Sequence, residues 1–375
     1  MDQRIGPDRR RSHPRRYRRR AGRRRAALSR PPAARTHTRR RPGLWFALLT
    51  AALALVCIAS LMFGAGSTGP ITSLATLLHA PAGDGGWASS GEARFVIESL
   101  RGPRTIVGVL VGAALGVAGA LLQAVTRNPL AEPGLLGVSA GSVLAVALAL
   151  AFGESAATLR VPVAQLGALA GCMAVLAAAR LRGVGNDPVR LVLAGAVLSG
   201  VLDALTYMIL LVDERTADEI RFWIVGSLAG RRLTDVTALL PGLAIAAAIV
   251  VAIARPLAAL ALGERVATGL GHRPRLVRFM VVIAVALLVG SATAIAGLIA
   301  FVGLVAPFAA RALAGPDVRR TLWLCLPAGA LMVVTADIVS RLVVRPSELP
   351  IGVLTALIGA PVLVAVVRLR RLPSL

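Results

Sequence analysis

Residues 105–125 read TIVGVLVGAALGVAGALLQAV and contain no charged side chain. A run of about 20 apolar residues is the length that an α-helix needs to cross the hydrocarbon core of a bilayer. Gly108, Gly112 and Gly116 recur at every fourth position, so they fall on one face of such a helix and let a second backbone approach closely. The stretch therefore predicts a membrane-spanning helix that packs inside a bundle.

Further apolar runs of similar length follow the same pattern along the chain. Hydrophobic residues make up 56% of the 375 residues and charged residues only 16%, whereas a soluble domain has about a quarter of its residues charged. The composition excludes a soluble enzyme and predicts an all-α polytopic membrane protein with about ten transmembrane helices. The expected spans are 44–63, 105–125, 135–152, 162–181, 189–212, 235–254, 276–297, 300–314, 322–339 and 351–367.

The basic residues predict how the chain lies in the membrane. Residues 1–41 hold 17 arginines and two acids, and such a segment buries too little apolar surface to fold. We expect residues 1–43 to be a disordered cytoplasmic tail, with anionic lipid as its one candidate ligand and no nucleic acid, because no aromatic residues are interleaved with the arginines. Residues 44–371 form the membrane domain. Its arginines are more numerous in alternate loops, which places both termini in the cytoplasm.

Several kinds of chemistry are excluded by the residue inventory. All 42 basic residues are arginine, so the chain has no lysine for a phosphate-binding Walker A loop. The three cysteines are far apart in apolar runs, and the four histidines are scattered. We therefore expect no metal site, no cofactor and no catalytic residue. If this membrane protein takes part in ATP-driven transport, another subunit hydrolyses the ATP.

Four stretches are too polar or too broken for uninterrupted membrane helices. They are 101–105, 127–141, 255–271 and a series of motifs between 297 and 361. Broken backbone at a membrane boundary is tolerated only where protein or a water-filled cavity covers it. The third and eighth spans are short or interrupted by glycine, and such a pair in the two halves of a chain is typical of repeat transporters. Residues 255–275 are expected inside, as two short helices that separate near Gly263.

These stretches resemble one known family. The motifs PRT (103–105), RNPLAEPGLLGVSAG (127–141), FWIVGSLAG (222–230), LALGE (260–264), FVGLVAP (301–307) and ELPIGVLTALIGAP (348–361) occur in order. Together they resemble the permease subunits of the iron-siderophore and cobalamin type of ATP-binding-cassette importers, a FecCD-like family. Two positions depart from the family pattern: Leu298 replaces a usual proline and Phe308 a usual histidine.

The resemblance implies a type II importer permease in the cytoplasmic membrane. It implies ten spans in each of two protomers, identical or related, with cytoplasmic ATPase subunits below and a substrate-binding protein on the outer face. The cargo is a metal chelate, with a ferric siderophore first and cobalamin or haem as the alternative. A secondary transporter driven by an ion gradient is a further alternative, which would need a coupling-ion site near the midplane.

Candidate site residues follow from position and from the resemblance. Relatives place arginines near Arg101, Arg104 and Arg341 against acids of the binding protein, whereas the alternative is interfacial snorkelling. Inside, an apolar face and neighbouring charges are expected to contact the ATPase. The residues of this coupling segment are Leu257, Leu260, Leu262, Gly263, Glu264 and Arg265.

Three more polar residues lie in or near apolar runs. Asp203 has no partner at helical spacing and is a candidate for lining the pathway, with a packed position as the alternative. Gln123 is a second pathway candidate, although a helix contact also explains it. Asp337 precedes Arg341 by four positions, which predicts an ion pair on one helix near the outer boundary.

Overall fold

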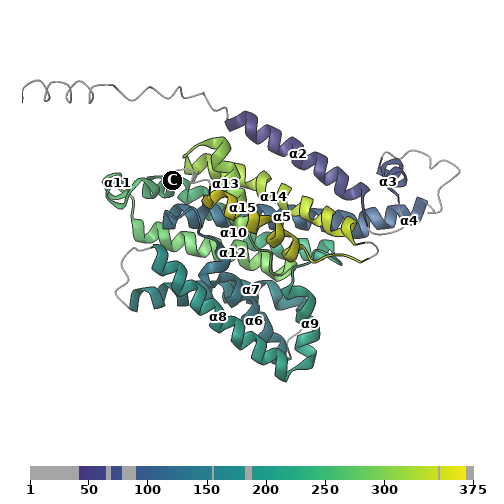
Figure 1. Ribbon diagram of the computed structural model, residues 1–375, viewed down its shortest axis with the longest axis horizontal. Coiled ribbons are helices and arrows are strands. Elements are labelled where there is room, and N and C mark those ends of the chain that lie inside the picture. The colour runs from purple at the N-terminus through teal and green to yellow at the C-terminus, as the bar shows by residue number, and fades with distance from the viewer. Residues whose placement is uncertain are drawn as a thin grey trace, which may run out of the picture. The chain divides into compact units, whose positions relative to one another are not determined.

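The computed structural model describes residues 42–64, 69–77, 90–153, 156–181, 188–344 and 347–368. Within these ranges each of the ten expected spans corresponds to one helix (Figure 1). They are α2 (Pro42–Met62), α5 (Gly102–Thr126), α6 (Val138–Ala151), α7 (Ala156–Leu181), α8 (Pro188–Val212), α10 (Leu233–Leu262), α12 (Pro274–Ala296), α13 (Val302–Ala314), α14 (Val318–Val343) and α15 (Ile351–Arg368). The Arg-rich tail lies outside the described residues.

Shorter elements connect these helices, and the described ranges contain no β-strand. The connecting elements are α3 (Pro70–Leu77), α4 (Ser90–Phe95), a π-helix (Val96–Arg101), a 3₁₀-helix (Pro133–Leu136), α9 (Glu214–Ile224) and α11 (Glu264–Gly269). The expected all-α membrane fold is confirmed.

Two of the spans are shorter than the others. Six stretches in the described residues are long and apolar enough to cross a membrane, whereas α6 and α13 have only 14 and 13 residues. These are the two spans that the sequence singled out. Each follows a stretch of irregular backbone: a turn and the 3₁₀-helix precede α6, and residues 297–301 precede α13.

Helix α5 lies in the middle of the bundle and packs against α14, α12 and α13. The predicted glycine face makes these contacts possible. A Cβ atom at Gly112 would lie 2.4 Å from the carbonyl oxygen of Gly329 in α14, and one at Gly116 would lie 2.8 Å from that of Cys325. Side chains at these positions would push α14 away, so the small residues determine how closely the two backbones approach.

The end of the sixth predicted span differs from the end of α10 in the structure. Residues 255–262 were expected to form a short separate helix, but they are the last turns of α10, which continues through Pro256 to Leu262. A proline removes one N–H donor but does not end every helix, because neighbouring helices hold the chain in place. The predicted break at Gly263 is confirmed: its φ of +143° is open to glycine and strained for other residues.

Candidate functional site

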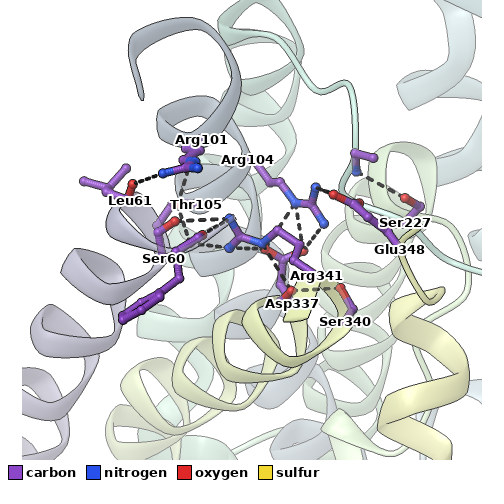
Figure 2. Close-up of polar contacts among 12 residues, drawn as sticks. Ser60, Leu61, Arg101, Arg104, Thr105, Ser227, Asp337, Ser340, Arg341 and Glu348 are labelled. Carbon is purple, nitrogen blue, oxygen red and sulfur yellow. Dashed lines mark hydrogen bonds and ion pairs between the residues drawn. The ribbon is translucent and has the colours of Figure 1, made fainter. Parts of the chain in front are cut away.

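A cluster of charged side chains joins α2, α5, α14 and the segment before α15 (Figure 2). Arg104 in the first turn of α5 lies between two carboxylates. Its Nη2 is 2.7 Å from Oδ1 of Asp337, and its Nη1 is 2.8 Å from Oε2 of Glu348. Asp337 comes from α14, and Glu348 lies three residues before α15 begins. One guanidinium therefore connects three parts of the chain that are far apart in sequence.

Asp337 also forms an ion pair with a second arginine, which lies on its own helix. Nη2 of Arg341 lies 2.7 Å from Oδ2 of Asp337, which is the ion pair that the four-residue spacing predicted. Arg341 also donates to the carbonyl oxygens of Ser60 and Phe63 at the end of α2, both at 3.1 Å. Its Nη2 bonds the Ser60 hydroxyl, which in turn bonds the hydroxyl of Thr105. These contacts fasten the C-terminal end of α2 to α14 and α5.

Arg101 binds the same end of α2. Its Nη1 donates to the carbonyl oxygens of Leu61 and Met62, at 2.9 and 3.0 Å, and to the Ser73 hydroxyl at 2.9 Å. The last carbonyls of a helix have no partner within the helix and carry partial negative charge. A guanidinium at this position satisfies them.

The cluster is buried, and this changes what its arginines offer a partner. Arg101, Arg104 and Arg341 were predicted to contact a binding protein, yet they are only 5%, 8% and 2% exposed. Burying a charge is costly unless the charge is paired and hydrogen-bonded. Arg104 and Arg341 are paired with carboxylates, and Arg101 is hydrogen-bonded to carbonyl and hydroxyl oxygens. The Glu348 side chain is 30% exposed and is the member of the cluster that is most open to solvent. Docking at the three arginines stays a prediction; their internal contacts give them a structural role as well.

On the other side of the bundle, the predicted apolar face of the coupling segment is wrong. Leu257 and Leu260 are 0% and 1% exposed and belong to the protein's own core, whereas Leu262 is 76% exposed. Successive residues of an α-helix are rotated by about 100°. Residues 257 and 260 therefore share a face, but residue 262 points to a different one.

What this segment does expose is the turn after α10 and the short helix α11. Leu262, Val266 and Leu270 are exposed apolar side chains around Gly263, and Arg265 is exposed beside them. Glu264 forms an ion pair with Arg278 of α12 at 3.1 Å, with both side chains partly open to solvent. The result is a small apolar surface bordered by charges, suitable for contact with a partner protein.

The two pathway candidates have different surroundings. Gln123 is fully buried between α5 and α13, where its Nε2 donates to the carbonyl oxygen of Gly303 at 3.3 Å. This is the helix contact that the sequence left open as the alternative. Asp203 lies on an exposed part of α8. Within the described residues, no group of three histidine, cysteine or acidic side chains is arranged to hold a metal ion.

Sequence reasoning missed Glu348 and Ser60. Glu348 meets Arg104 across 244 positions, and Ser60 meets Arg341 across 281, so no local spacing predicts either contact. The available signal for Glu348 was its place at the start of ELPIGVLTALIGAP, an acid directly before an apolar run. Such an acid next to a buried arginine neutralises charge that the bundle otherwise leaves unpaired.

Comparison with known proteins gives consistent matches. Residues 52–369 match the FecCD transport family. The chain is 44% identical over 284 residues to the ferric enterobactin transport system permease protein FepD of Escherichia coli K12, covering 76% of this chain and 84% of FepD. It is 39% identical over 278 residues to the probable siderophore transport system permease protein YfiZ of Bacillus subtilis 168, covering 73% and 82%.

Solved structures agree with these matches. An inward-facing structure of a metal-chelate type ABC transporter superposes with a TM-score of 0.70 and 27% identity, covering 87% of this chain and 99% of that one. PsaBC from Streptococcus pneumoniae superposes with a TM-score of 0.54 at 17% identity, which supports the fold alone.

Proposed function

The chain belongs to the FecCD transport family, and from this premise we propose that it is the permease subunit of an ATP-binding-cassette importer for a ferric siderophore. The observation that carries the proposal is the family match across residues 52–369, together with relatives named for ferric enterobactin and siderophore transport. Cobalamin and haem remain the alternative cargoes.

The proposed complex has three kinds of component. Two permease protomers enclose the pathway, cytoplasmic ATPase subunits supply the energy, and a binding protein delivers the chelate outside. The absence of lysine from the sequence supports a separate ATPase, because a Walker A loop requires that residue. The arginine distribution supports cytoplasmic termini, and the tail is proposed to be a disordered segment near anionic lipid.

An ion-coupled secondary transporter has less support. Its coupling site would need carboxylates or unwound carbonyls near the midplane. Asp203, the acid that the sequence analysis considered for the pathway, lies on an exposed part of α8. A secondary transporter also gives no reason for an exposed apolar segment at 262–270.

Uptake in cells tests the cargo. In a strain that lacks this gene, we expect loss of ferric-siderophore uptake and its restoration by the gene, with cobalamin and haem uptake unchanged in parallel assays. Loss of cobalamin or haem uptake with normal siderophore uptake would contradict the siderophore assignment.

The contact with the ATPase is tested by cysteine crosslinking. We expect Leu262→Cys and Leu270→Cys to crosslink to the ATPase in membranes, because both side chains are exposed, Leu262 at the end of α10 and Leu270 directly after α11. The work requires replacement of the native Cys57, Cys172 and Cys325. Leu257→Cys is the matched control: it lies one and a half turns from Leu262 on the same helix, but its side chain is buried.

Charge reversal gives an independent measure of the same contact. Glu264→Arg is expected to reduce transport by about tenfold, since it places two cations together where an ion pair stood and presents the opposite charge to the partner. Two results would show that the ATPase docks elsewhere. One is a crosslink at the buried position 257 alone. The other is normal transport by Glu264→Arg together with no crosslink at position 262 or 270.

A further inference from the structure

The segment between α5 and α6 contacts both the end of α10 and the start of α13. At its start, Arg127 is the C-cap of α5 and adopts the left-handed conformation, with φ of 51°. Its Nη2 donates to the carbonyl oxygen of Leu260, at 2.5 Å. Leu260 lies in the last turn of α10, and its carbonyl oxygen also accepts the N–H of the C-cap Gly263 at 3.1 Å. The guanidinium therefore holds the end of α10 directly before Gly263 and α11.

The residues after Arg127 form a tight turn. The Ala131 N–H donates to the carbonyl oxygen of Asn128 at 3.1 Å, and the Leu130 N–H donates to the Asn128 side chain at 3.0 Å. Pro129 fixes its own φ angle within this turn. These bonds restrain residues 128–131, which leaves a short connection between Arg127 on one side of the turn and Glu132 on the other.

At its far end, the segment binds the first turn of α13. Oε1 of Glu132 accepts from the backbone N–H of Phe301, the N-cap of α13, at 2.5 Å. The Pro133 ring lies against Gly303: a Cβ atom there would be 2.9 Å from Cδ of the proline. Gly303 also lies against Gly119, so α13 begins beside the second half of α5 and not at the end of that helix. A carboxylate is well placed there, because the N-terminal end of a helix is positive.

We propose that residues 127–133 form a strap that couples movement of the α10–α11 junction to the half-length helix α13, with Arg127 and Glu132 as its positioning residues. This inference rests on the proposed function, since it assumes that α11 receives the ATPase. Arg127 is bonded to the end of α10 and Glu132 to the N-cap of α13, and the turn of residues 128–131 joins the two. Loss of either contact disconnects ATP hydrolysis from the pathway while the transmembrane helices remain in place.

The test measures chelate imported per ATP hydrolysed in proteoliposomes that contain the permease, its ATPase and the binding protein. Arg127→Asn removes the guanidinium and tolerates the left-handed backbone, and Glu132→Ala removes the acceptor. Each variant is expected to lower the ratio about tenfold, the size of one lost hydrogen bond to a charged group. The double variant should be no worse than the poorer single variant, because both changes break one strap.

Two further variants separate this coupling from general damage. Glu132→Gln keeps a carbonyl oxygen for the Phe301 N–H and should retain most of the ratio. Gly134→Ala, with nothing within 4 Å of the added Cβ, should match wild type. Two results would contradict the proposed strap. One is a double variant whose loss of chelate imported per ATP equals the product of the two single losses. The other is a wild-type ratio of import to hydrolysis in Arg127→Asn. If the permease with Glu132→Ala does not assemble with its ATPase, the ratio measured for Arg127→Asn alone decides whether the strap exists. Failure of the wild-type complex to import any iron chelate would instead contradict the proposed function.

Discussion

Replacing Asp337 with alanine is expected to remove most of the folded protein from the membrane. Its carboxylate is the shared partner of Arg104 and Arg341, at 2.7 Å from each, and both arginines are buried. Removal of one partner from a buried ion pair costs about 3–5 kcal/mol, because the remaining charge is left without compensation. Here two guanidinium groups lose their partner at once. The measurement is the thermal midpoint and the yield of monodisperse protein in detergent.

Glu219→Ala provides the matched control for that prediction. Glu219 also pairs with an arginine at four-residue spacing, but Arg215 lies 3.8 Å away and both side chains are exposed. An exposed pair contributes about 0–1 kcal/mol, so this variant should unfold close to wild type. Equal midpoints for Asp337→Ala and Glu219→Ala would show that the cluster at the end of α2 does not hold the bundle together.

Replacing Gly119 with valine is expected to prevent α13 from packing on α5. The first added carbon would lie 1.7 Å from the carbonyl oxygen of Gly303, and the group that it meets is backbone. Overpacking of a core by side chains costs about 1–3 kcal/mol and more where the neighbour cannot move. We expect little folded protein and no transport, measured as yield after membrane extraction and as chelate uptake.

The control for this variant is Gly200→Ala in α8. That glycine also lies inside a membrane helix, but a Cβ atom there meets nothing within 4 Å. Alanine is the better helix former, so the control should fold as well as wild type or slightly better. Normal folding of Gly119→Val would mean that α13 does not lie against α5 as described.

The fold was predictable from the sequence because the bilayer imposes a length on each span. Every apolar run corresponded to one helix, and the glycine repeat of residues 108–116 identified the face of α5 that meets α14. The boundary that failed lies after residue 254, where the sixth span was expected to end, whereas α10 continues through Pro256 to Leu262. Sequence patterns report the preference of a residue alone, whereas in the bundle neighbouring helices override it.

The site was predictable only where its contacts are local. The Asp337–Arg341 pair follows from spacing on one helix, and the structure confirms it. The Arg104–Asp337 and Arg127–Leu260 contacts join residues 233 and 133 positions apart, so they depend on tertiary packing. The leucines of 257–262 were misassigned for a different reason: hydrophobicity was considered without the rotation of about 100° per residue that separates their directions.

The most direct test of the central claim is import by the purified complex. Permease, ATPase and binding protein are reconstituted in vesicles without an ion gradient, and accumulation of a labelled ferric siderophore is measured with ATP or with a non-hydrolysable analogue. The account predicts accumulation that requires ATP hydrolysis and the binding protein together. Accumulation that proceeds without ATP when a proton or sodium gradient is imposed would contradict it.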